Sequence, residues 1–378
     1  MRVNACQSVN AMINFVSNNA QTGVFSVFGM RTVYWDFEKQ EVCMIDQRRL
    51  PAALEVISLR TCQDVSEAIK NMTVRGAPAI GAAAAFGLAL AVRESKFGET
   101  ASCYSDLQAA AAVLKAARPT AINLAWAVDR MLKVIGGQLE GRTLEELQAV
   151  ALSEAQRIAD EDVEINQRMA QHGAALIEDG DTIIHHCNTG ALAAVDWGTA
   201  LGVIRTAFGQ GKRVHVLVDE TRPRLQGARL TAWELQQYGI PYEIITDSMA
   251  GHFLSRGEVQ KVLFGADRIA ANGDVANKIG TYMLALAAKD NGSPVYAVAP
   301  TSSIDLSLAD GRLIPIEERD PEEVLGIRFH GEPIAPQEAK ARNPGFDVTP
   351  NRLISAIVTE NGIVYPSFEE NLRKKLKR

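Results

Sequence analysis

Short apolar runs alternate with longer amphipathic stretches along the second half of the chain. The runs at 182–186, 213–219, 242–246, 261–266 and 294–299 predict buried strands. The stretches between them, at 191–208, 228–238, 248–256 and 277–289, predict helices. Strands that alternate with helices form parallel sheets with helices on both faces. We therefore predict a Rossmann-like α/β domain over residues 181–372.

The first half of the chain has a different pattern. Strand-like runs at 32–35 and 41–46 precede long segments rich in Ala and Leu, which predicts a mainly helical N-terminal domain with a small β-sheet over 30–150. Helical spacing continues from Thr143 to Leu176, where Thr143 and Glu146 form a capping-box pattern. We expect a connecting helix over 151–180 to join the two domains.

Composition and charge exclude several classes of function. The 378 residues are 47% hydrophobic, enough for two cores, and the net charge of −6 gives no basic field for nucleic acid. The apolar run at 79–92 is too short to span a bilayer, so no membrane segment is expected. Five scattered cysteines without a C-x-x-C pair argue against disulfides and zinc, and they favour a reducing cytoplasm.

The two ends of the chain differ from the rest. Residues 1–29 are rich in Asn and Ser and lack periodic apolar positions, which predicts a disordered extension upstream of Met30. Residues 373–378 are almost all basic, and we expect them to form a solvated tail.

Polar residues that could take part in catalysis or binding follow the predicted strands. Cys187 ends the first strand, and Asp219, Asp247 and Asp267 follow the next three. In open α/β sheets, ligands bind in the crevice outside the carboxyl ends of the strands. We therefore expect these side chains to converge on one crevice. No glycine-rich dinucleotide fingerprint or P-loop follows any strand, so the sequence does not indicate a nucleotide cofactor.

Asp267 and Lys278 are candidates for acid chemistry and anion binding. An apolar surround would raise the pKa of Asp267 and let it hold a proton near neutral pH. After a turn at Asn272-Gly273, Asn277 and Lys278 are predicted to begin a helix, whose free N–H groups and ammonium would cradle a phosphate.

Arg75, Arg118 and Gln226 are further candidates for binding an anion or a sugar. Arg75 and Gly76 precede a predicted helix with Pro78 in its first turn, and Arg118 precedes a second predicted helix at 121–132. These arginines could clamp one phosphate. Within the segment 220–227, Gln226 could bind sugar hydroxyls, whereas Arg222 and Arg224 could instead be held structurally by Asp219 and Glu220.

Taken together, these motifs resemble those of the 5-methylthioribose-1-phosphate isomerases over about residues 30–372. The matching segments are 74–81, 117–124, 186–190, 220–227 and 265–269 with Asn277-Lys278. This family shares its fold with the regulatory subunits of eukaryotic initiation factor 2B and with ribose-1,5-bisphosphate isomerase. The resemblance implies a homodimeric aldose–ketose isomerase of methionine salvage that needs no metal or organic cofactor. It implies that Cys187 and Asp267 are catalytic and that the sugar phosphate is bound by Arg75, Gly76, Ala77, Arg118, Gln226, Asn277 and Lys278.

The implied reaction explains why such residues are needed. The anomeric oxygen carries the phosphate, so opening of the sugar ring requires an acid at the ring oxygen, a role that suits protonated Asp267. The hydrogen at C2 then reaches C1 either as a proton through an enolate, with Cys187 as acid/base or stabiliser, or as a hydride. The sequence leaves both routes open, although an apolar lining would favour the hydride route.

Two alternative functions are weighed against this one. The substrate could be ribose 1,5-bisphosphate or 5-deoxyribose 1-phosphate; a second phosphate would need further cations, and no unassigned basic residue beside the motifs clearly supplies them. A methylthio group needs an apolar pocket, for which Trp126, Trp197 and Phe253 are candidates or else core residues. The chain could also be a non-catalytic regulatory subunit like those of factor 2B, which would have no use for a Cys187–Asp267 pair.

Overall fold

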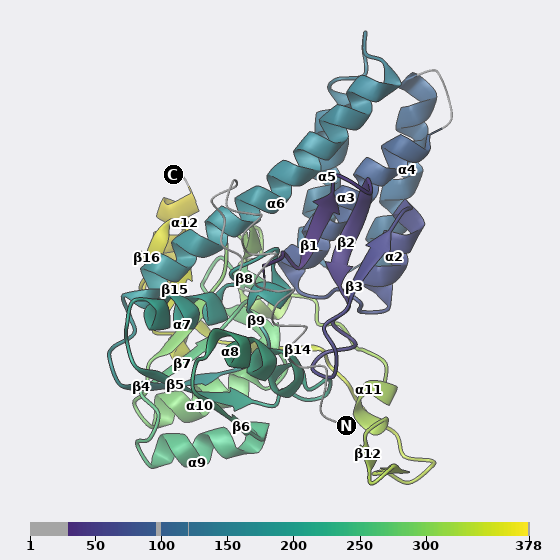
Figure 1. Ribbon diagram of the computed structural model, residues 1–378. Helices are drawn as coiled ribbons and strands as arrows, with labels where there is room; N and C mark the ends of the chain where they lie inside the picture. The colour runs from purple at the N-terminus through teal and green to yellow at the C-terminus, as the bar shows by residue number, and fades with distance from the viewer. Residues whose placement is uncertain (1–28, 96–99, 120, 377–378) are drawn as a thin grey trace.

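The computed structural model describes residues 29–95, 100–119 and 121–376 (Figure 1). The expectation of disorder for 1–29 falls, apart from Gly29, outside the described residues. The described chain forms a helical part with a small sheet and a second part built around a larger sheet. This arrangement confirms the predicted α/β class.

The N-terminal part packs helices against a three-stranded antiparallel sheet. The strand at 56–59 was not predicted, because its side chains are mostly exposed and its sequence lacks an apolar alternation. The elements are β1 (Val33–Asp36), β2 (Glu41–Ile45), β3 (Val56–Leu59), α2 (Cys62–Lys70), α3 (Ala77–Glu94), α4 (Thr100–Ala117) and α5 (Ile122–Gly136).

Helix α3 is the central helix of this part. It is long and apolar enough to cross a membrane by length and composition, but 78% of that window is buried inside the protein. Its small Ala and Gly residues let α2, α4, α5 and α6 pack closely around it. The apolar character of α3 is therefore explained by its place in the core.

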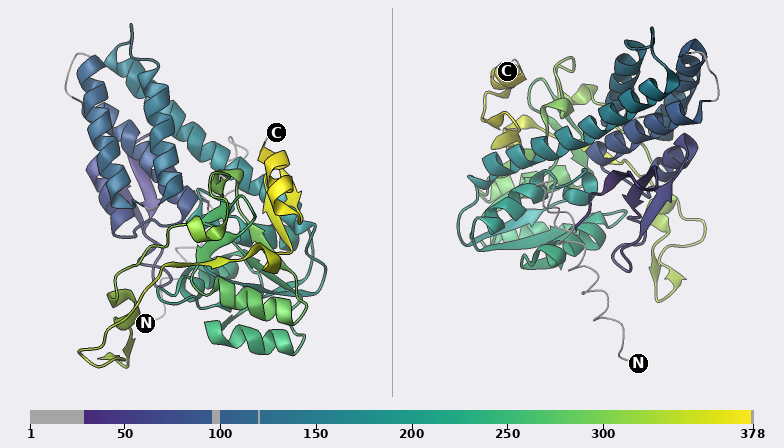
Figure 2. Two further views of the ribbon diagram at one scale, coloured as in Figure 1. Left: turned by 180° about the vertical axis from the view of Figure 1, so that it is seen from behind. Right: turned by 45° about the horizontal axis from the view of Figure 1, so that its top comes forward.

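Helix α6 (Leu144–Ala174) joins the two parts, as Figures 1 and 2 show. The predicted capping box is present: the Thr143 hydroxyl accepts from the Glu146 N–H, and the Glu146 carboxylate accepts from the Thr143 N–H. Residues between Leu147 and Val163 pack in the N-terminal core, whereas Met169 and Ala174 pack in the core of the larger sheet. One helix thus belongs to both cores.

The larger sheet has seven strands in the order β16-β15-β10-β7-β4-β5-β6. All neighbouring strands run parallel except the pair β15–β16. From β4 the chain adds β5 and β6 on one side, then β7, β10 and β15 on the other, so the winding direction switches between β4 and β7. Ligands bind at such switch points. The strands are β4 (Asp181–His185), β5 (Val214–Asp219), β6 (Tyr242–Ile245), β7 (Lys261–Phe264), β10 (Val295–Val298), β15 (Ala356–Thr359) and β16 (Gly362–Val364).

Helices and short turns connect these strands, and buried side chains on both faces of the sheet form separate clusters. The helices are α7 (Ala200–Gly209), α8 (Ala232–Tyr238), α9 (Ala250–Ser255), α10 (Thr281–Asp290), α11 (Glu322–Leu325) and α12 (Phe368–Leu376). The single-turn segments are η1 (Ala191–Ala193), η2 (Gly227–Thr231), η3 (Asp247–Met249), η4 (Thr301–Ser303), η5 (Gly311–Leu313) and η6 (Asn351–Leu353).

Two smaller sheets were not predicted. A four-stranded sheet has the order β11-β8-β9-β14, and a two-stranded hairpin, β12–β13, projects from the body (Figure 1). Their strands are short. The strands β11 and β14 pair with residues far away in the sequence, and β12 and β13 have only two residues each, so no local pattern indicates them. The strands are β8 (Arg268–Ala270), β9 (Val275–Lys278), β11 (Ile304–Asp305), β12 (Arg328–Phe329), β13 (Glu332–Pro333) and β14 (Phe346–Thr349).

Three predicted segments differ from the structure. The helix predicted at 191–208 begins only at Ala200, because Trp197 and Gly198 both have positive φ and interrupt it. The helix predicted at 277–289 begins at Thr281, because 275–278 pair as a strand with β8 and β14. The described basic residues after 372 are not a free tail but the last turn of α12, where Lys374 Nζ lies 2.6 Å from Glu370.

Candidate active site

A cavity of about 210 Å³ lies where the carboxyl ends of β4 and β7 meet the start of α3. Residues from both parts of the molecule line it, and every site residue that the family resemblance implies is among them. These are Arg75, Gly76, Ala77, Arg118, Cys187, Gln226, Asp267, Asn277 and Lys278. The fold thus brings together groups that are up to 203 positions apart, from 75 to 278.

Not every strand-end residue reaches the cavity. Asp219 and Asp247 do not line it, contrary to the expectation that all of them converge there. The Asp247 carboxylate accepts the backbone N–H groups of Thr221 and Arg222, at 2.7 Å each. Asp219 instead accepts a hydrogen bond from His186. These carboxylates therefore hold the turns behind the cavity.

Cys187 lies on a sharp turn immediately after β4. Its φ of 70° is uncommon for a residue other than Gly. The conformation is held from both sides, because its N–H donates to Thr221 Oγ1 at 2.9 Å and its carbonyl accepts from Thr231 Oγ1 at 2.8 Å. The Gln226 amide lies 3.4 Å from the thiol sulfur. The turn thereby presents a partly buried thiol to the cavity.

Asp267 follows β7, the strand beside β4. Its N–H donates to the carbonyl of Ala276 at 2.9 Å, which fixes the backbone at this point. Burial raises the pKa of the Asp267 carboxyl, although the positive charges of Lys278, Arg118 and Arg75 act in the opposite direction. Burial therefore shifts this carboxyl toward its protonated form.

The N-terminal part contributes the start of α3. Gly76 has a φ of 103°, and a Cβ at this position would lie 2.3 Å from the carbonyl oxygen of Ala193. Only glycine permits this close approach of the two backbones. Arg75, beside it, donates to the backbone and side-chain oxygens of Asn188. The helix start is thus joined directly to the Cys187 turn.

Several buried polar atoms around the cavity have no hydrogen-bond partner among the described residues. They include Arg75 Nε, Arg118 Nε and Gln226 Oε1. Buried donors and acceptors are almost always satisfied in folded proteins, by protein, water or a ligand. Burial lowers the pKa of both arginines, but a guanidinium keeps its charge at neutral pH. An anion with oxygen atoms matches the unpaired donors.

Lys278 and Asn277 enter the site from the strand β9. They do not lie at the start of a helix, which was the prediction. Burial lowers the pKa of the Lys278 ammonium, which donates to the Gly345 carbonyl and lies 4.4 Å from the centre of the Phe346 ring. Asn277 is buried, and its amide donates to Thr281 Oγ1 at 3.0 Å. The predicted anion-binding helix N-terminus at 277 is therefore wrong, although both side chains line the cavity.

Further arginines line the cavity that the sequence analysis did not assign. Arg224 lies 3.0 Å from Glu323, and Arg319 lies 2.6 Å from the same carboxylate, so Arg224 is held by Glu323 and not by Asp219 or Glu220. Arg222 donates to the carbonyls of Pro223 and Val324. The remaining cavity arginines also have protein partners: Arg48 with Asp46, Arg268 with Asp305, and Arg229 with the carbonyls of Gln47, Arg48 and Leu50.

The apolar wall of the cavity comes from residues that the sequence analysis missed. Trp126, Trp197 and Phe253 do not line it. Trp126 and Trp197 pack against the guanidinium groups of Arg130 and Arg205, and Phe253 packs on the core of the sheet. The apolar residues that line the cavity include Met72, Pro78, Ile80, Ile122, Leu230, Ile314, Ile316 and Phe346.

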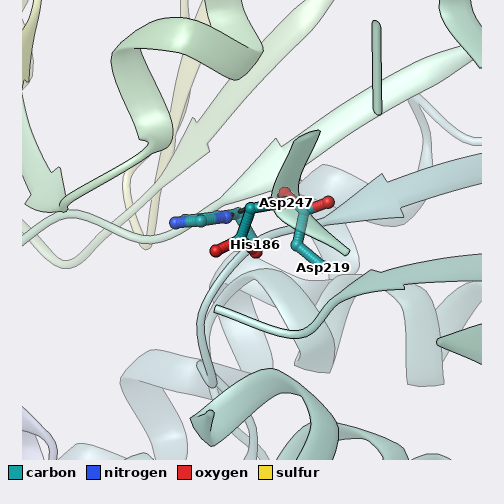
Figure 3. A group of neighbouring side chains, drawn as sticks. All are labelled: His186, Asp219 and Asp247. Atoms are coloured by element: carbon teal, nitrogen blue, oxygen red, sulfur yellow. Dashed lines mark hydrogen bonds and ion pairs between the residues drawn. The ribbon is translucent and has the colours of Figure 1, made fainter. Parts of the chain in front are cut away.

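His186, Asp219 and Asp247 form a cluster behind the cavity that has suitable atoms for a metal ion (Figure 3). Its ligand atoms lie within 4.8 Å of one another. However, Asp247 already accepts two backbone N–H groups, and both ring nitrogens of His186 are hydrogen-bonded. The cluster therefore fits a hydrogen-bond network better than a metal site.

Comparison with known proteins assigns the family. Residues 73–366 match the Initiation factor 2 subunit family. The methylthioribose-1-phosphate isomerase 2 of Pseudothermotoga lettingae is 53% identical over 344 residues, which cover 91% of this chain and 97% of that protein. The methylthioribose-1-phosphate isomerase of Thermotoga maritima is 51% identical over 347 residues, 92% of this chain and 99% of that protein. The chain belongs to the methylthioribose-1-phosphate isomerase family.

The solved structures that resemble this chain include an isomerase and a protein named as a translation initiation factor. The 5-methylthioribose 1-phosphate isomerase of Pyrococcus horikoshii OT3 superposes with a TM-score of 0.86 at 47% identity, over 92% of this chain and 96% of that one. A structure named translation initiation factor eIF-2B, subunit delta, from A. fulgidus gives a TM-score of 0.82 at 45% identity, over 92% and 100%. The resemblance inferred from the sequence motifs is confirmed.

Proposed function

We propose that this isomerase converts 5-methylthio-D-ribose 1-phosphate to 5-methylthio-D-ribulose 1-phosphate in methionine salvage. The observation that carries the proposal is the cavity itself. It combines a thiol, a carboxyl with a raised pKa and unpaired guanidinium donors with an apolar wall. The proposal is supported by relatives of that name that are about half identical over nearly the whole chain.

In the proposed complex, the phosphate lies at the start of α3. The N–H groups at Gly76 and Ala77 and the guanidinium groups of Arg75 and Arg118 supply donors and positive charge there, and Lys278 adds a third cation. Gln226 and Asn277 supply amide groups for the sugar hydroxyls. Three of these groups, Arg75 Nε, Arg118 Nε and Gln226 Oε1, are buried atoms without a hydrogen-bond partner among the described residues.

Ring opening is the first chemical step. Asp267 gives its proton to the ring oxygen as the bond from C1 to that oxygen breaks, which leaves a positive charge shared by C1 and the phosphate oxygen. The raised pKa of Asp267 suits this role, because the carboxyl must be protonated at the start of the reaction.

Hydrogen transfer from C2 to C1 follows. In the hydride route, the C2 hydrogen moves to C1 with its electron pair while the C2 hydroxyl loses its proton to the Cys187 thiolate, giving the ketone. In the enolate route, Cys187 removes the C2 proton to give an enol, whose C2 hydroxyl then loses its proton as C1 gains one, giving the same ketone. The apolar wall favours the hydride route because it excludes water from a charged intermediate.

Isotope exchange separates the two routes and also tests the activity. Methylthioribose 1-phosphate is incubated with the pure protein in D₂O, and the ketose is detected by NMR. Absence of ketose would remove the proposed activity. Ketose without deuterium at C1 supports the hydride route, and ketose with deuterium at C1 supports the enolate route.

The substituent at C5 distinguishes this substrate from ribose 1,5-bisphosphate and 5-deoxyribose 1-phosphate. The cavity does hold further arginines, but each of them is paired with protein carboxylates or carbonyls. A second phosphate would have to displace those partners, whereas a methylthio group can pack on the apolar wall. Comparison of kcat/KM for the three sugars tests this choice, and a preference for the bisphosphate would overturn it.

We also propose that the enzyme is a homodimer of the cytoplasm. The described part of the chain exposes large apolar side chains on the projecting hairpin, such as Phe329 at 70% and Ile334 at 53% exposure. The thiols of Cys43, Cys62 and Cys187 are free, which suits a reducing compartment. Light scattering of the pure protein tests the dimer, and fractionation of cells tests the location.

A further inference from the structure

Two arginines that line the cavity, Arg224 and Arg319, share one carboxylate, that of Glu323 on α11. Arg224 Nη1 lies 3.0 Å from Glu323 Oε1, and Arg319 Nη2 lies 2.6 Å from the same oxygen. Glu323 Oε2 accepts from Arg319 Nε at 2.8 Å and from Asn343 Nδ2 at 3.1 Å. A carboxylate has about four sites for accepting hydrogen bonds. The Glu323 carboxylate is therefore saturated by its protein donors.

The charge of Glu323 is fixed by these contacts. Burial acts to raise the pKa of Glu323, but the hydrogen bonds and charge of Arg319, together with hydrogen bonds from Arg224 and Asn343, outweigh it and lower the pKa to about 2. The carboxylate is therefore ionised at neutral pH. Its side chain is only 13% exposed and does not line the cavity. Glu323 thus acts as the protein's own anion, bound from behind by two arginines of the cavity wall.

Arg224 and Arg319 are distinct from the arginines of the proposed phosphate clamp. Arg75 Nε and Arg118 Nε have no hydrogen-bond partner among the described residues, whereas Arg224 and Arg319 are paired with a carboxylate. The two groups are nevertheless close. Burial lowers the pKa of Arg118, and the charges of Arg319 and Arg224 act in the same direction. One cavity therefore holds one set of open donors and a second set that is already occupied.

The segment that carries Arg319 also supplies part of the apolar wall. Ile314 and Ile316 lie shortly before Arg319 in the chain, and both line the cavity. This part of the cavity presents apolar side chains beside an arginine whose charge is already matched by Glu323. An uncharged C5 substituent can pack against such a wall, whereas a phosphate would have to compete with Glu323 for its donors.

We propose that Glu323 is a specificity-determining residue, which excludes sugars with a phosphate at C5 because it occupies the donors of Arg224 and Arg319. The carboxylate takes the place that a second phosphate would need. This inference rests on the proposed function, since it concerns which sugar 1-phosphate the same cavity accepts. Removal of the carboxylate would leave two guanidinium groups at the cavity able to bind a second phosphate.

The first test measures binding without turnover. Kd values for ribose 1-phosphate and ribose 1,5-bisphosphate are compared by isothermal titration calorimetry in a Cys187→Ser background. With Glu323 in place, the second phosphate is expected to strengthen binding by less than about threefold, because its donors are occupied. After Glu323→Gln it is expected to strengthen binding by about tenfold or more, because charge-assisted hydrogen bonds become available. A tenfold gain with Glu323 intact would overturn the proposal, and that result needs no variant at position 323.

The controls separate this carboxylate from net charge and from folding. Glu322→Gln removes the same charge from the exposed neighbouring residue of α11, and its effect on the two Kd values is expected to stay within about twofold. If Glu322→Gln produced the same gain as Glu323→Gln, net charge alone would explain it and the proposal would fail. Glu323→Ala, which also leaves space for phosphate oxygens, gives the same comparison if the Gln variant does not fold. Loss of the folded structure in both variants would show a structural role and would likewise reject the proposal.

Turnover separates this inference from the proposed function. In the otherwise wild-type enzyme, Glu323→Gln is expected to raise kcat/KM for ribose 1,5-bisphosphate relative to that for methylthioribose 1-phosphate by about tenfold or more. A purely structural role would lower both values equally, and an unchanged ratio would therefore contradict the role of Glu323. If the wild-type protein does not turn over methylthioribose 1-phosphate, the proposed function fails while the binding comparison still tests Glu323.

Discussion

The guanidinium of Arg75 donates to both the backbone carbonyl and the side-chain oxygen of Asn188. Arg75 begins the binding segment of the N-terminal part, and Asn188 directly follows Cys187. The Asn188 amide in turn donates to Glu234 Oε1 at 2.7 Å and Thr231 Oγ1 at 3.1 Å. The proposed phosphate clamp and the proposed catalytic turn are therefore held in one hydrogen-bond network.

The proposed catalytic pair is tested by conservative substitution. Cys187→Ser and Asp267→Asn are each expected to lower kcat by at least about 100-fold, the lower range for acid–base groups, without loss of the folded structure. The control is Asp179→Asn, a surface carboxylate paired with Arg213. Steady-state kinetics and circular dichroism are the measurements, and near-normal turnover in either active-site variant would remove that residue from the mechanism.

The phosphate clamp is tested by removal of its guanidinium groups. A charge-assisted hydrogen bond contributes about 1.5 to 3 kcal/mol, so Arg75→Ala and Arg118→Ala are expected to raise KM about tenfold to a hundredfold. Arg312→Ala, which removes an exposed arginine of the surface pair with Asp310, is the matched control. Unchanged KM in both clamp variants would contradict the role of these residues.

The dependence of turnover on pH reports the proton on Asp267. Burial raises its pKa, and the acid role needs the protonated form, so Asp267 is expected to set the alkaline limb of the profile, with kcat falling as pH rises through this pKa. Glu317 is one of the groups that raise it. Glu317→Gln is therefore expected to move the alkaline limb of the profile to lower pH, and a shift to higher pH would contradict the assignment.

Substitution of Gly76 tests how much the close approach of the two parts of the molecule contributes to stability. Gly76→Ala combines a φ of 103° with a contact of 2.3 Å to the Ala193 carbonyl oxygen, so we expect the free energy of unfolding to fall by about 2 kcal/mol or more. Gly180→Ala is the control, because its φ of 95° carries similar backbone strain but no atom lies within 4 Å of the new Cβ. Urea denaturation compares them, and equal losses would show that backbone strain alone matters.

Much of the fold follows from local pattern. The apolar runs predict β4, β5, β6, β7 and β10, although not the parallel strand β15, and Thr143 with Glu146 predicts the start of α6. Periodicity and capping can be recognised because they involve residues only a few positions apart. Cys187 is placed at the end of the first strand of this domain for the same reason. The family motifs name the residues that line the cavity, since most of them lie in short contiguous segments.

Other features were decided only by tertiary contacts. Asn277 and Lys278 lie in a strand because residues 275–278 pair with 346–349, about 70 positions later in the chain. Ile314, Ile316 and Arg319 reach the cavity from a segment that has no motif.

The position of His186 depends on contacts of the same kind. Its two ring nitrogens are hydrogen-bonded to Asp219 and to the Ile279 carbonyl, which come from two different parts of the chain. The sequence by itself determined five strands of the larger sheet, the helical character of the N-terminal part and the residues able to do the chemistry. Only the tertiary structure decided which of them face the cavity and which are held behind it, because burial and hydrogen-bond partners arise from residues that are distant along the chain.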